Sequence, residues 1–402
     1  MPRYTLFISH MEIRHFYKPI ILLALVTLCS GACHKAVVEP DEPDNRGTKL
    51  ADLKPTGATA SFYGLLDWSV DGSELFYLVF IQYTTPTAGN YHLYALNVRT
   101  GTSRLVYDGP GGLNLITITN PATYFQSPDG QYLYLAARGR GQAGYSLYRI
   151  NTRQTNQAVV IDSSYDQRYP ASPYVPSTVL SADGSRLGFQ YRPDSVRIHD
   201  LVNKTSVRFG AAQAIAFSPD ASQVLLPQPN SGMYRNVSLT NVAETLVDPR
   251  VLPVNPAIAT PSRDDIRWHS EGIRHVYTDL YRDGANSATA SLHLLLWNVT
   301  QQKKTLLWTV PDQEAGVGSV VWARNGQRLV FTSSNSQQVY AGRTNYIMYT
   351  TDLTTLKTSR VATITLEDEE KSSGPNQLLI SPDHTQLAYS IGSKLYAAPI
   401  QP

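Results

Sequence analysis

The side chains of this sequence that are best suited to binding chemistry are tyrosines and arginines that recur together in polar segments. Residues 163–176 read SSYDQRYPASPYVP and carry Tyr165, Arg168, Tyr169 and Tyr174. Aromatic rings and guanidinium groups of this kind stack on sugar rings and anchor peptides in interfaces. The segment is therefore a candidate binding site. The alternative interpretation is that the segment is a connection stiffened by prolines, whose tyrosines only cover neighbouring parts of the fold.

Three further polar segments contain the same kinds of side chain. A run of alternating arginine and glycine offers two guanidinium groups to an anion, and two other segments bring a tyrosine close to an arginine. The residues concerned are Arg138, Arg140, Tyr281, Arg282, Tyr340 and Arg343. Each segment is also typical of a solvated hairpin tip, as is the acidic run at residues 367–370, which would otherwise attract a cation or a basic partner.

Motifs of catalysis are absent from the sequence. It contains no G-x-S-x-G, no H-E-x-x-H and no G-x-x-x-x-G-K-[ST] pattern. Five histidines could in principle converge with carboxylates on a metal: His92, His199, His269, His275 and His293. His92 and His293 each stand five residues before an asparagine, which favours a repeated structural role. We therefore expect no metal site, no catalytic residue and no cofactor.

The N-terminal 32 residues form an export signal. Arg14 and Lys18 precede an apolar stretch at residues 19–28, and small residues follow at 30–32. A membrane span needs about 20 apolar residues, so we expect no transmembrane helix. Met11 is closer to the basic residues than Met1 is, and translation could begin there.

Cys33 ends the run Ser30-Gly31-Ala32-Cys33, which resembles the lipobox of bacterial lipoproteins. That resemblance implies an acylated Cys33 as the first mature residue and a place in the bacterial cell envelope, as an outer-membrane lipoprotein facing the periplasm or the cell surface. The membrane would then be a partner through the lipid anchor. Leu is commoner than Ser at position 30, which leaves open a conventional signal peptide cut nearby. Residues 33–47 are rich in proline and acidic residues and read as an extended tether.

Composition indicates a globular, all-β protein. The chain has 402 residues, with 42% hydrophobic and 16% charged side chains, 25 tyrosines and only 4 methionines. Removal of residues 1–32 takes away three basic residues and one acidic residue, so 34 − 3 = 31 basic residues balance 32 − 1 = 31 acidic residues. This net charge of zero disfavours nucleic acid as a partner.

A short turn motif recurs seven times along the chain. It combines a small residue such as Ser with Asp, Glu or Asn and usually Gly. The copies stand at residues 68–72, 126–130, 180–184, 217–221, 268–272, 322–326 and 380–384. Successive acidic or Asn positions are 58, 54, 37, 51, 54 and 58 residues apart. Spacings of this size indicate a repeat architecture.

Each turn introduces a unit of four strands. Pro, Ser and Gly suit successive positions of a tight turn between two strands. The run after the turn, such as Leu75–Phe80 or Tyr132–Ala137, is almost continuously apolar, so both faces of the sheet must be covered. A third run such as His92–Val98 and a fourth such as Ser103–Tyr107 follow. Four-stranded units packed between like units are typical of propeller blades.

With these motifs the sequence resembles the TolB-like and WD-repeat-like β-propellers, whose blades begin with such a strand, a Ser-Pro-Asp-Gly turn and a second strand. The resemblance covers about residues 48–402 and implies the fold. It does not imply an activity, because propellers host many unrelated functions.

The last unit lacks a fourth strand, since only residues 386–391 and 394–398 follow its turn. Residues 48–53 or 58–62, ahead of the first unit, could supply the missing strand. We therefore predict a seven-bladed β-propeller of four-stranded antiparallel blades over residues 48–402, closed into a ring by an N-terminal strand. A short fourth blade and Glu271 in an irregular turn leave six or eight blades open.

The connections predict where binding takes place. In a blade, the loops between the second and third strands share one face of the disc with the blade-to-blade crossings, and here these connections are the long ones. They are residues 82–91, 138–145, 163–176, 249–265, 281–290, 333–345 and 367–375. We expect a lipid-anchored envelope module that binds a protein, peptide or glycan there. The alternative is an envelope enzyme, a polysaccharide lyase or hydrolase, with its site in the channel mouth.

Overall fold

The structure is a computed structural model in which residues 44–402 form one compact unit. It describes residues 45–53, 60–82, 89–108, 113–114, 124–139, 146–163, 178–192, 195–210, 216–228, 233–247, 266–282, 290–311, 314–335, 344–366 and 375–400. The expected signal peptide, Cys33 and most of the expected tether lie outside these residues. No helix in the described ranges is long and apolar enough to span a membrane.

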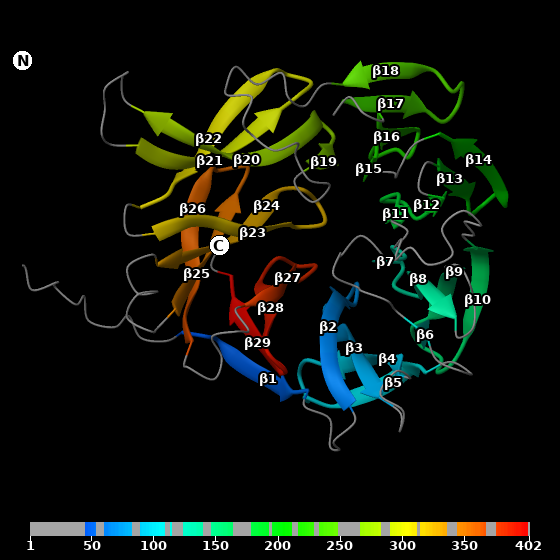
Figure 1. The fold of residues 1–402 in the computed structure, drawn as a ribbon, viewed down its shortest axis with the longest axis horizontal. Coiled ribbons are helices and arrows are strands. Elements are labelled where there is room, and N and C mark those ends of the chain that lie inside the picture. Colours follow the sequence, from blue (N-terminus) through cyan, green and yellow to red (C-terminus); the bar gives the residue numbers. More distant parts are fainter. Residues whose placement is uncertain are drawn as a thin grey trace, which may run out of the picture. The chain divides into compact units, whose positions relative to one another are not determined.

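The described secondary structure consists of strands arranged in four-stranded antiparallel sheets (Figure 1). From the inner to the outer strand, blade 1 contains β2 (Ala60–Trp68), β3 (Glu74–Gln82), β4 (Gly89–Asn97) and β5 (Ser103–Tyr107). Blade 2 contains β7 (Tyr124–Gln126), β8 (Tyr132–Gly139), β9 (Ser146–Asn151) and β10 (Ala158–Ser163). Blade 3 contains β11 (Thr178–Leu180), β12 (Arg186–Arg192), β13 (Ser195–Asp200) and β14 (Thr205–Phe209). Blade 4 contains β15 (Ala216–Phe217), β16 (Gln223–Pro227), β17 (Tyr234–Ser238) and β18 (Glu244–Val247).

The remaining blades follow the same plan. Blade 5 contains β19 (Ile266–His269), β20 (Gly272–Arg282), β21 (Ala290–Asn298) and β22 (Lys303–Thr309). Blade 6 contains β23 (Glu314–Trp322), β24 (Arg328–Asn335), β25 (Thr344–Asp352) and β26 (Lys357–Leu366). Blade 7 contains β27 (Asn376–Ile380), β28 (Gln386–Ile391), β29 (Lys394–Pro399) and β1 (Thr48–Asp52). A two-residue strand, β6 (Leu113–Asn114), joins blades 1 and 2.

The Ser-x-Asp-Gly turns between inner and second strands form through one repeated hydrogen-bond pattern. In blade 2 the Ser127 hydroxyl donates to Asp129 Oδ1 over 2.6 Å and accepts from the Tyr132 amide over 2.9 Å. Asp129 Oδ1 also accepts from the Gln131 amide over 3.0 Å. The same pattern fixes the turns of blades 1, 3, 4 and 7. The short polar side chains therefore satisfy backbone donors that the turn would otherwise leave unpaired.

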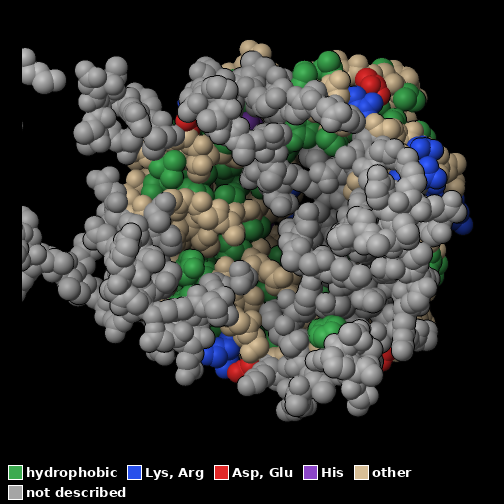
Figure 2. Space-filling model, in the orientation of Figure 1, with side chains coloured by type: hydrophobic (Ala, Val, Ile, Leu, Met, Phe, Trp, Pro, Cys, Tyr) green, Lys and Arg blue, Asp and Glu red, His purple; other side chains and the backbone are tan. Residues whose placement is uncertain are grey.

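Hydrophobic clusters fill the spaces between neighbouring blades. Figure 2 shows hydrophobic side chains on the surface over blades 5 and 6. Separate clusters join blades 1 and 2, 2 and 3, 3 and 4, 4 and 5, 5 and 6, 6 and 7, and 7 and 1. The second strands are almost continuously apolar because each sheet packs against a neighbouring sheet on both of its faces. The predicted seven-bladed ring is confirmed, and six or eight blades are not observed.

The N-terminal strand closes the ring, as predicted. Thr48 pairs with Ala397 and Asp52 with Lys394, so β1 becomes the outer strand of blade 7. Blades 7 and 1 then share a cluster in which Trp68 and Leu75 pack near Leu395. Of the two segments considered for closure, residues 48–53 perform it, because Ala60–Trp68 is itself the inner strand of blade 1.

The chain contacts the propeller from Asn45, three residues before the expected start of the domain at Thr48. The Asn45 amide donates to the Thr363 carbonyl over 2.9 Å, and Arg46 Nη2 donates to the Thr365 carbonyl over 2.5 Å. The Tyr389 hydroxyl donates to the Arg46 carbonyl. Residues 45 and 46 are thus held against β26 of blade 6 and β28 of blade 7.

Blade 5 has the irregular turn that the sequence indicated. His269 pairs directly with Gly272, so Ser270 and Glu271 alone form the loop between β19 and β20. Glu271 accepts an ion-pair hydrogen bond from Arg274, a buried side chain of β20. The turn is shorter than those of the other blades, yet it occupies the same place between inner and second strands.

Candidate functional site

The strand directions divide the connections between two faces of the propeller. The turns from first to second strand and from third to fourth strand lie on one face, here called the turn face. The connections from second to third strand and from blade to blade lie on the opposite face, here called the loop face. The turn-face connections are short, as in Ser69–Ser73 or Val98–Thr102. The seven long connections all join strand ends at the loop face.

This topology brings the described candidates, Arg138, Tyr281 and Arg282, to strand ends at the loop face. Arg138 stands near the end of β8, and Tyr281 and Arg282 end β20, both of which are second strands that end at this face. The segment with Tyr165, Arg168, Tyr169 and Tyr174 joins the end of β10 to the start of β11 at the same face. These four residues and Arg140, Tyr340 and Arg343 lie outside the described residues, so their positions remain predictions.

An extra two-residue strand, β6, is added to the sheet next to Arg138. Leu113 of β6 pairs with Tyr91 of β4 on one side and with Gly139 of β8 on the other, and Asn114 pairs with Arg138. Blades 1 and 2 are therefore linked by a continuous sheet where they reach the loop face. An arginine at this place is held on a rigid backbone instead of a hairpin tip.

The five histidines considered as metal ligands do not gather. His92, His199 and His293 belong to third strands of three different blades, and His269 and His275 belong to inner and second strands of blade 5. His269 Nε2 lies 2.9 Å from Gln327 Nε2, and His199 Nε2 lies 2.8 Å from Asp162 Oδ2. Within the described ranges, no three His, Cys, Asp or Glu side chains form a group that could hold a metal ion.

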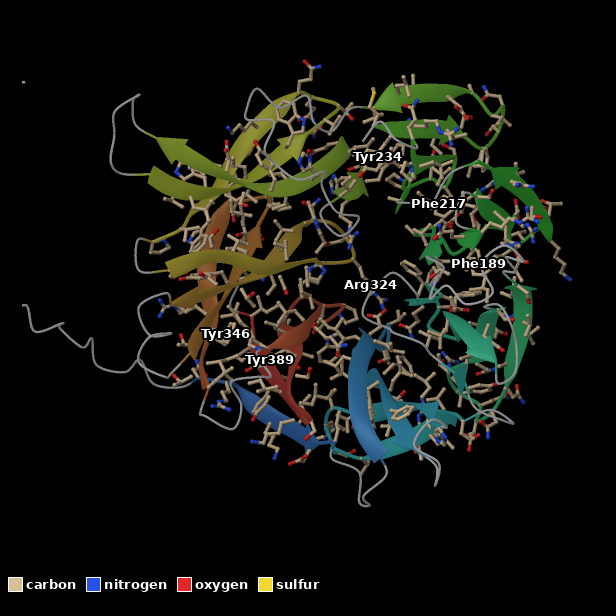
Figure 3. All side chains as sticks on the ribbon, viewed as in Figure 1. Phe189, Phe217, Tyr234, Arg324, Tyr346 and Tyr389 are labelled. Atoms are coloured by element: carbon tan, nitrogen blue, oxygen red, sulfur yellow. The ribbon has the colours of Figure 1, made fainter. Side chains whose placement is uncertain are left out.

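Arg324 bridges three blades where the inner strands reach the turn face. It belongs to the turn of blade 6, and Figure 3 shows it pointing toward the inner strands of blades 1 and 2. Its Nη2 forms an ion pair with Asp67 Oδ2 and donates to the Trp68 carbonyl over 3.2 Å and to Gln126 Oε1 over 3.3 Å. Burial raises the pKa of the Asp67 carboxyl, and the guanidinium of Arg324 offsets part of that rise.

Two further polar contacts join inner strands near the same face. Trp68 Nε1 donates to the Leu379 carbonyl of blade 7 over 3.0 Å. His269 of blade 5 contacts Gln327 of blade 6, and burial together with the charge of Arg274 lowers the pKa of His269. With Arg324, these contacts link blades 5, 6, 7, 1 and 2. The turn-face end of the axis is thus held by specific polar contacts between blades.

A buried carboxylate lies between blades 5 and 6. Glu314, at the start of β23, accepts a hydrogen bond of 2.6 Å from the Tyr349 hydroxyl through Oε1. Burial and the nearby Glu314 carboxylate raise the pKa of Tyr349 well above its ordinary value, so the hydroxyl remains a donor. Glu314 is only 8% exposed, and Tyr349 packs among Trp308 and Phe331. The pair is a contact inside the core and is closed to a ligand.

The comparison with solved structures finds the same architecture. An oligogalacturonate lyase in complex with manganese superposes with a TM-score of 0.54 at 15% identity, covering 90% of this chain and 95% of that chain. An oligogalacturonate lyase from Vibrio parahaemolyticus gives 0.52 at 12% identity, covering 88% and 93%. The C-terminal WD40 domain of Sif2 gives 0.52 at 12% identity, covering 89% and 99%. The likeness is one of fold. No family model matches the sequence, and no curated protein is similar to it.

Sequence reasoning missed the polar contacts between blades. Arg324 and Asp67 are 257 residues apart, and Asp162 and His199 are 37 residues apart in different blades. One signal was present, because Arg324 replaces the Pro, Ala or Val found at its position in five of the other turns, those of blades 1, 2, 3, 4 and 7. A charged residue at a turn position that is usually small and apolar indicates that its side chain makes a contact outside the turn itself.

Proposed function

We propose that this protein is a cell-envelope binding module, anchored by a lipid on Cys33, that recognises a protein, peptide or glycan at the loop face of its propeller. The anchor rests on the lipobox-like sequence before Cys33. The tether from Cys33 to Asn45 spans 12 residues, which reach at most about 40 Å when fully extended. Because the Asn45 amide is bonded to the Thr363 carbonyl of β26, the tether would meet the propeller at blade 6.

The observation that carries the proposal is that the candidate segments all begin at strand ends on the loop face. In each blade the second strand and the outer strand end at the loop face. The segments that contain the candidate tyrosines and arginines follow these strand ends in the sequence. The candidate segments leave from blades 2, 5 and 6, so their side chains would share this one face of the propeller. Proteins place binding residues on such loops because a rigid scaffold holds their ends while the loops vary.

The turn face makes a poorer candidate. Its connections are short, and their polar side chains are occupied with the turns themselves, as Ser127 and Asp129 are. Arg324 is bound to Asp67 at the same face. A partner at that face would have to compete with hydrogen bonds that hold the fold.

The test is capture of envelope components by the purified mature protein with and without the substitutions Tyr165→Ala, Arg168→Ala and Tyr169→Ala. We expect the wild type to retain one component and the triple variant to lose it. A matched control carries Thr354→Ala, Thr355→Ala and Leu356→Ala in a turn-face connection of blade 6 and should keep it. Equal capture by the two variants would remove the loop at 163–176 from the proposal.

The anchor is tested separately by cell fractionation. Cys33→Ala should move the protein from the membrane fraction to the soluble fraction of the envelope, while an Ala36→Gly control stays with the membrane. A Cys33→Ala protein that sediments with the membrane would contradict lipid anchoring. That outcome would leave the loop-face proposal untouched, because capture uses the purified mature protein.

A further inference from the structure

The outer strand of each blade has one edge without a neighbouring strand, and in most blades the next blade contacts that edge. In blades 1, 3, 5 and 6 a backbone carbonyl at this edge accepts a hydrogen bond from the following blade or from the segment before β1. The bonded pairs are Asn156 with Val106 of β5, Arg235 with Gly210 directly after β14, Thr358 with Leu307 of β22, and Asn45 with Thr363 of β26. At β1, a Cβ atom on Gly101 of blade 1 would lie 3.3 Å from the Leu50 carbonyl.

The outer strands of blades 2 and 4, β10 and β18, lack this cover. Among the described residues, no group of another blade is bonded to the backbone of either strand. Figure 1 shows both strands at the rim of the propeller. They are also the two outer strands without a lysine or an arginine, which β1, β5, β14, β22 and β26 all contain. Proteins commonly protect open strand edges with such residues, so β10 and β18 are unprotected in both respects.

Of these two strands, β10 has the more apolar edge. Val159 is 54% exposed and Val160 is 50% exposed, and successive residues of a strand point to opposite faces of the sheet. Val160 shares the blade 1 side with Ala158, which packs in the cluster between blades 1 and 2, so Val159 lies on the blade 3 side. The edge of β10 is therefore aliphatic on both faces, and a strand added beside it would cover both valines. The shorter β18 has one exposed aliphatic residue, Leu246.

The backbone of β10 offers regular hydrogen-bonding groups at this edge. The Asn151 amide donates to the Gln157 carbonyl over 2.8 Å, so these two residues form a hydrogen-bonded pair. The next pair along the ladder, Ile150 with Ala158, is then a non-hydrogen-bonded pair. Ala158 and Val160 consequently point their N–H and C=O groups away from β9. The register shifts after Val160, which ends the regular part of the edge.

The strand that fits this edge is short, uncharged and aliphatic on both faces. The one charged side chain of β10, Asp162, is 9% exposed and already bonded to Arg197 and His199 of blade 3. A charged partner segment would therefore find no counter-ion on β10. Residues 158–161 of β10 itself read Ala-Val-Val-Ile and have the composition that the edge requires.

We propose that two copies of this chain pair antiparallel through β10, with a two-fold axis beside Val159. Val160 of one copy then stands opposite Ala158 of the second copy, and the outward N–H and C=O groups of these residues bond to each other. Val159 stands opposite Val159 of the second copy in a non-hydrogen-bonded pair, where side chains of opposite residues are closest. The same surface serves both copies, as in most two-fold dimers. It is separate from the proposed loop-face site.

The first test is sedimentation velocity of the mature protein. We expect a dimer whose fraction rises between about 1 and 200 µM, because a small interface associates weakly. Val160→Lys should raise the dissociation constant about tenfold or more, since pairing would bury its ammonium group beside an aliphatic strand. The matched control is Leu246→Lys, which makes the same kind of change on β18 at a side chain that is 59% exposed. It should leave the dimer unchanged.

The second test fixes the register by a disulfide bond. In the mature protein with Cys33→Ala, which contains no other cysteine, Val159→Cys places two thiols opposite each other across the two-fold axis. Opposite residues of such a pair have the separation that a disulfide requires, so mild oxidation should give a covalent dimer in high yield. Val202→Cys is the control, because Val202 is 72% exposed but belongs to the turn between β13 and β14. It should remain largely monomeric under the same conditions.

Three outcomes would overturn the proposal. One is a wild-type protein that stays monomeric up to about 200 µM, where even weak interfaces associate. Another is dissociation of the dimer by Leu246→Lys as strongly as by Val160→Lys, and the third is equal crosslinking of Val159→Cys and Val202→Cys. Thermal unfolding verifies that each variant is folded. None of these results bears on capture at the loop face.

Discussion

Arg324 of blade 6 is bonded to Asp67 of blade 1, across the seventh blade that separates them in the ring. The contact joins a turn-face connection to the end of the inner strand β2, and Arg324 reaches blade 2 as well through Gln126. Asp67 is the more buried partner, since its side chain is 21% exposed and that of Arg324 is 43% exposed. A buried carboxylate depends on its cation, so this contact helps to fix the spacing of the inner strands.

The first prediction concerns this pair. Arg324→Gln should lower the free energy of unfolding by about 1–2 kcal/mol, because Asp67 keeps its burial and loses its cation, with partial exposure limiting the effect. Asp67→Asn in the same background should recover part of the loss, giving a coupling of about 0.5–2 kcal/mol in a double-mutant cycle. Urea denaturation measures all four proteins. Additive effects would show that the pair does not stabilise the ring.

The second prediction concerns backbone strain in the turns between third and outer strands. Val242 and Leu356 have φ of 57° and 56°, where Gly101 in the equivalent turn of blade 1 has 68°. Side chains at positive φ cost about 1–2 kcal/mol, and a β-branched residue is strained most. Val242→Gly should therefore raise the free energy of unfolding by about 1 kcal/mol, and Gly101→Ala should lower it by a similar amount.

Ala243→Gly is the control for the second prediction, because Ala243 is not among the positive-φ residues. It should be neutral or destabilising, as glycine gains entropy in the unfolded chain. Equal effects of Val242→Gly and Ala243→Gly would contradict the assignment of strain.

The third prediction is acid sensitivity that comes from the repeated turns. The hydroxyl of a serine is the main cause that lowers the pKa of Asp71, Asp129, Asp220 and Asp383, and for Asp220 the pKa falls to about 2. A carboxyl whose folded-state pKa is lowered stabilises the fold above its ordinary pKa and loses this contribution as pH falls. Thermal stability should thus decline from about pH 4 to about pH 2.

Asp220→Asn should make that decline shallower in a series of melting temperatures between about pH 2 and pH 6, because one titrating carboxyl is gone. Ser206→Ala, in an exposed part of β14, serves as the control and should keep the slope of the wild type. A slope unchanged by Asp220→Asn would mean that the turn aspartates do not govern acid stability.

The fourth prediction concerns closure of the ring. A mature protein that begins at Lys54 lacks β1 and should melt at least about 5 °C below the wild type, since blade 7 loses its outer strand and the cluster with blade 1 is opened. A protein that begins at Asp44 retains Asn45 and Arg46 and should melt like the full mature chain. Similar melting of both truncations would show that β1 contributes little.

The sequence predicted the ring because its determinants are local and repeated. Five of the seven turns combine a Ser with an Asp two residues further on, as at Ser127 and Asp129, and such short spacings are visible in a single chain. The closing strand was predictable from the missing fourth strand of blade 7, since residues 386–398 supply only two after the turn.

The contacts between blades were not predictable for a physical reason. The ion pair of Arg197 with Asp162 depends on how two sheets twist and approach each other, and neither residue stands in a repeated position. Gln377 likewise reaches from blade 7 to accept from the Leu65 amide over 2.6 Å, 312 residues away. The loop-face candidates Arg168 and Tyr169 lie outside the described residues, so sequence reasoning remains their only support.

The central claim is that partners bind at the loop face, and site-specific photo-crosslinking in the native host tests it most directly. A photoreactive amino acid replaces Arg168 at the loop face in one strain and Thr355 at the turn face in another. Residue 168 is predicted to yield a discrete crosslinked species and residue 355 none. A species formed from residue 355 and absent from residue 168 would contradict the claim.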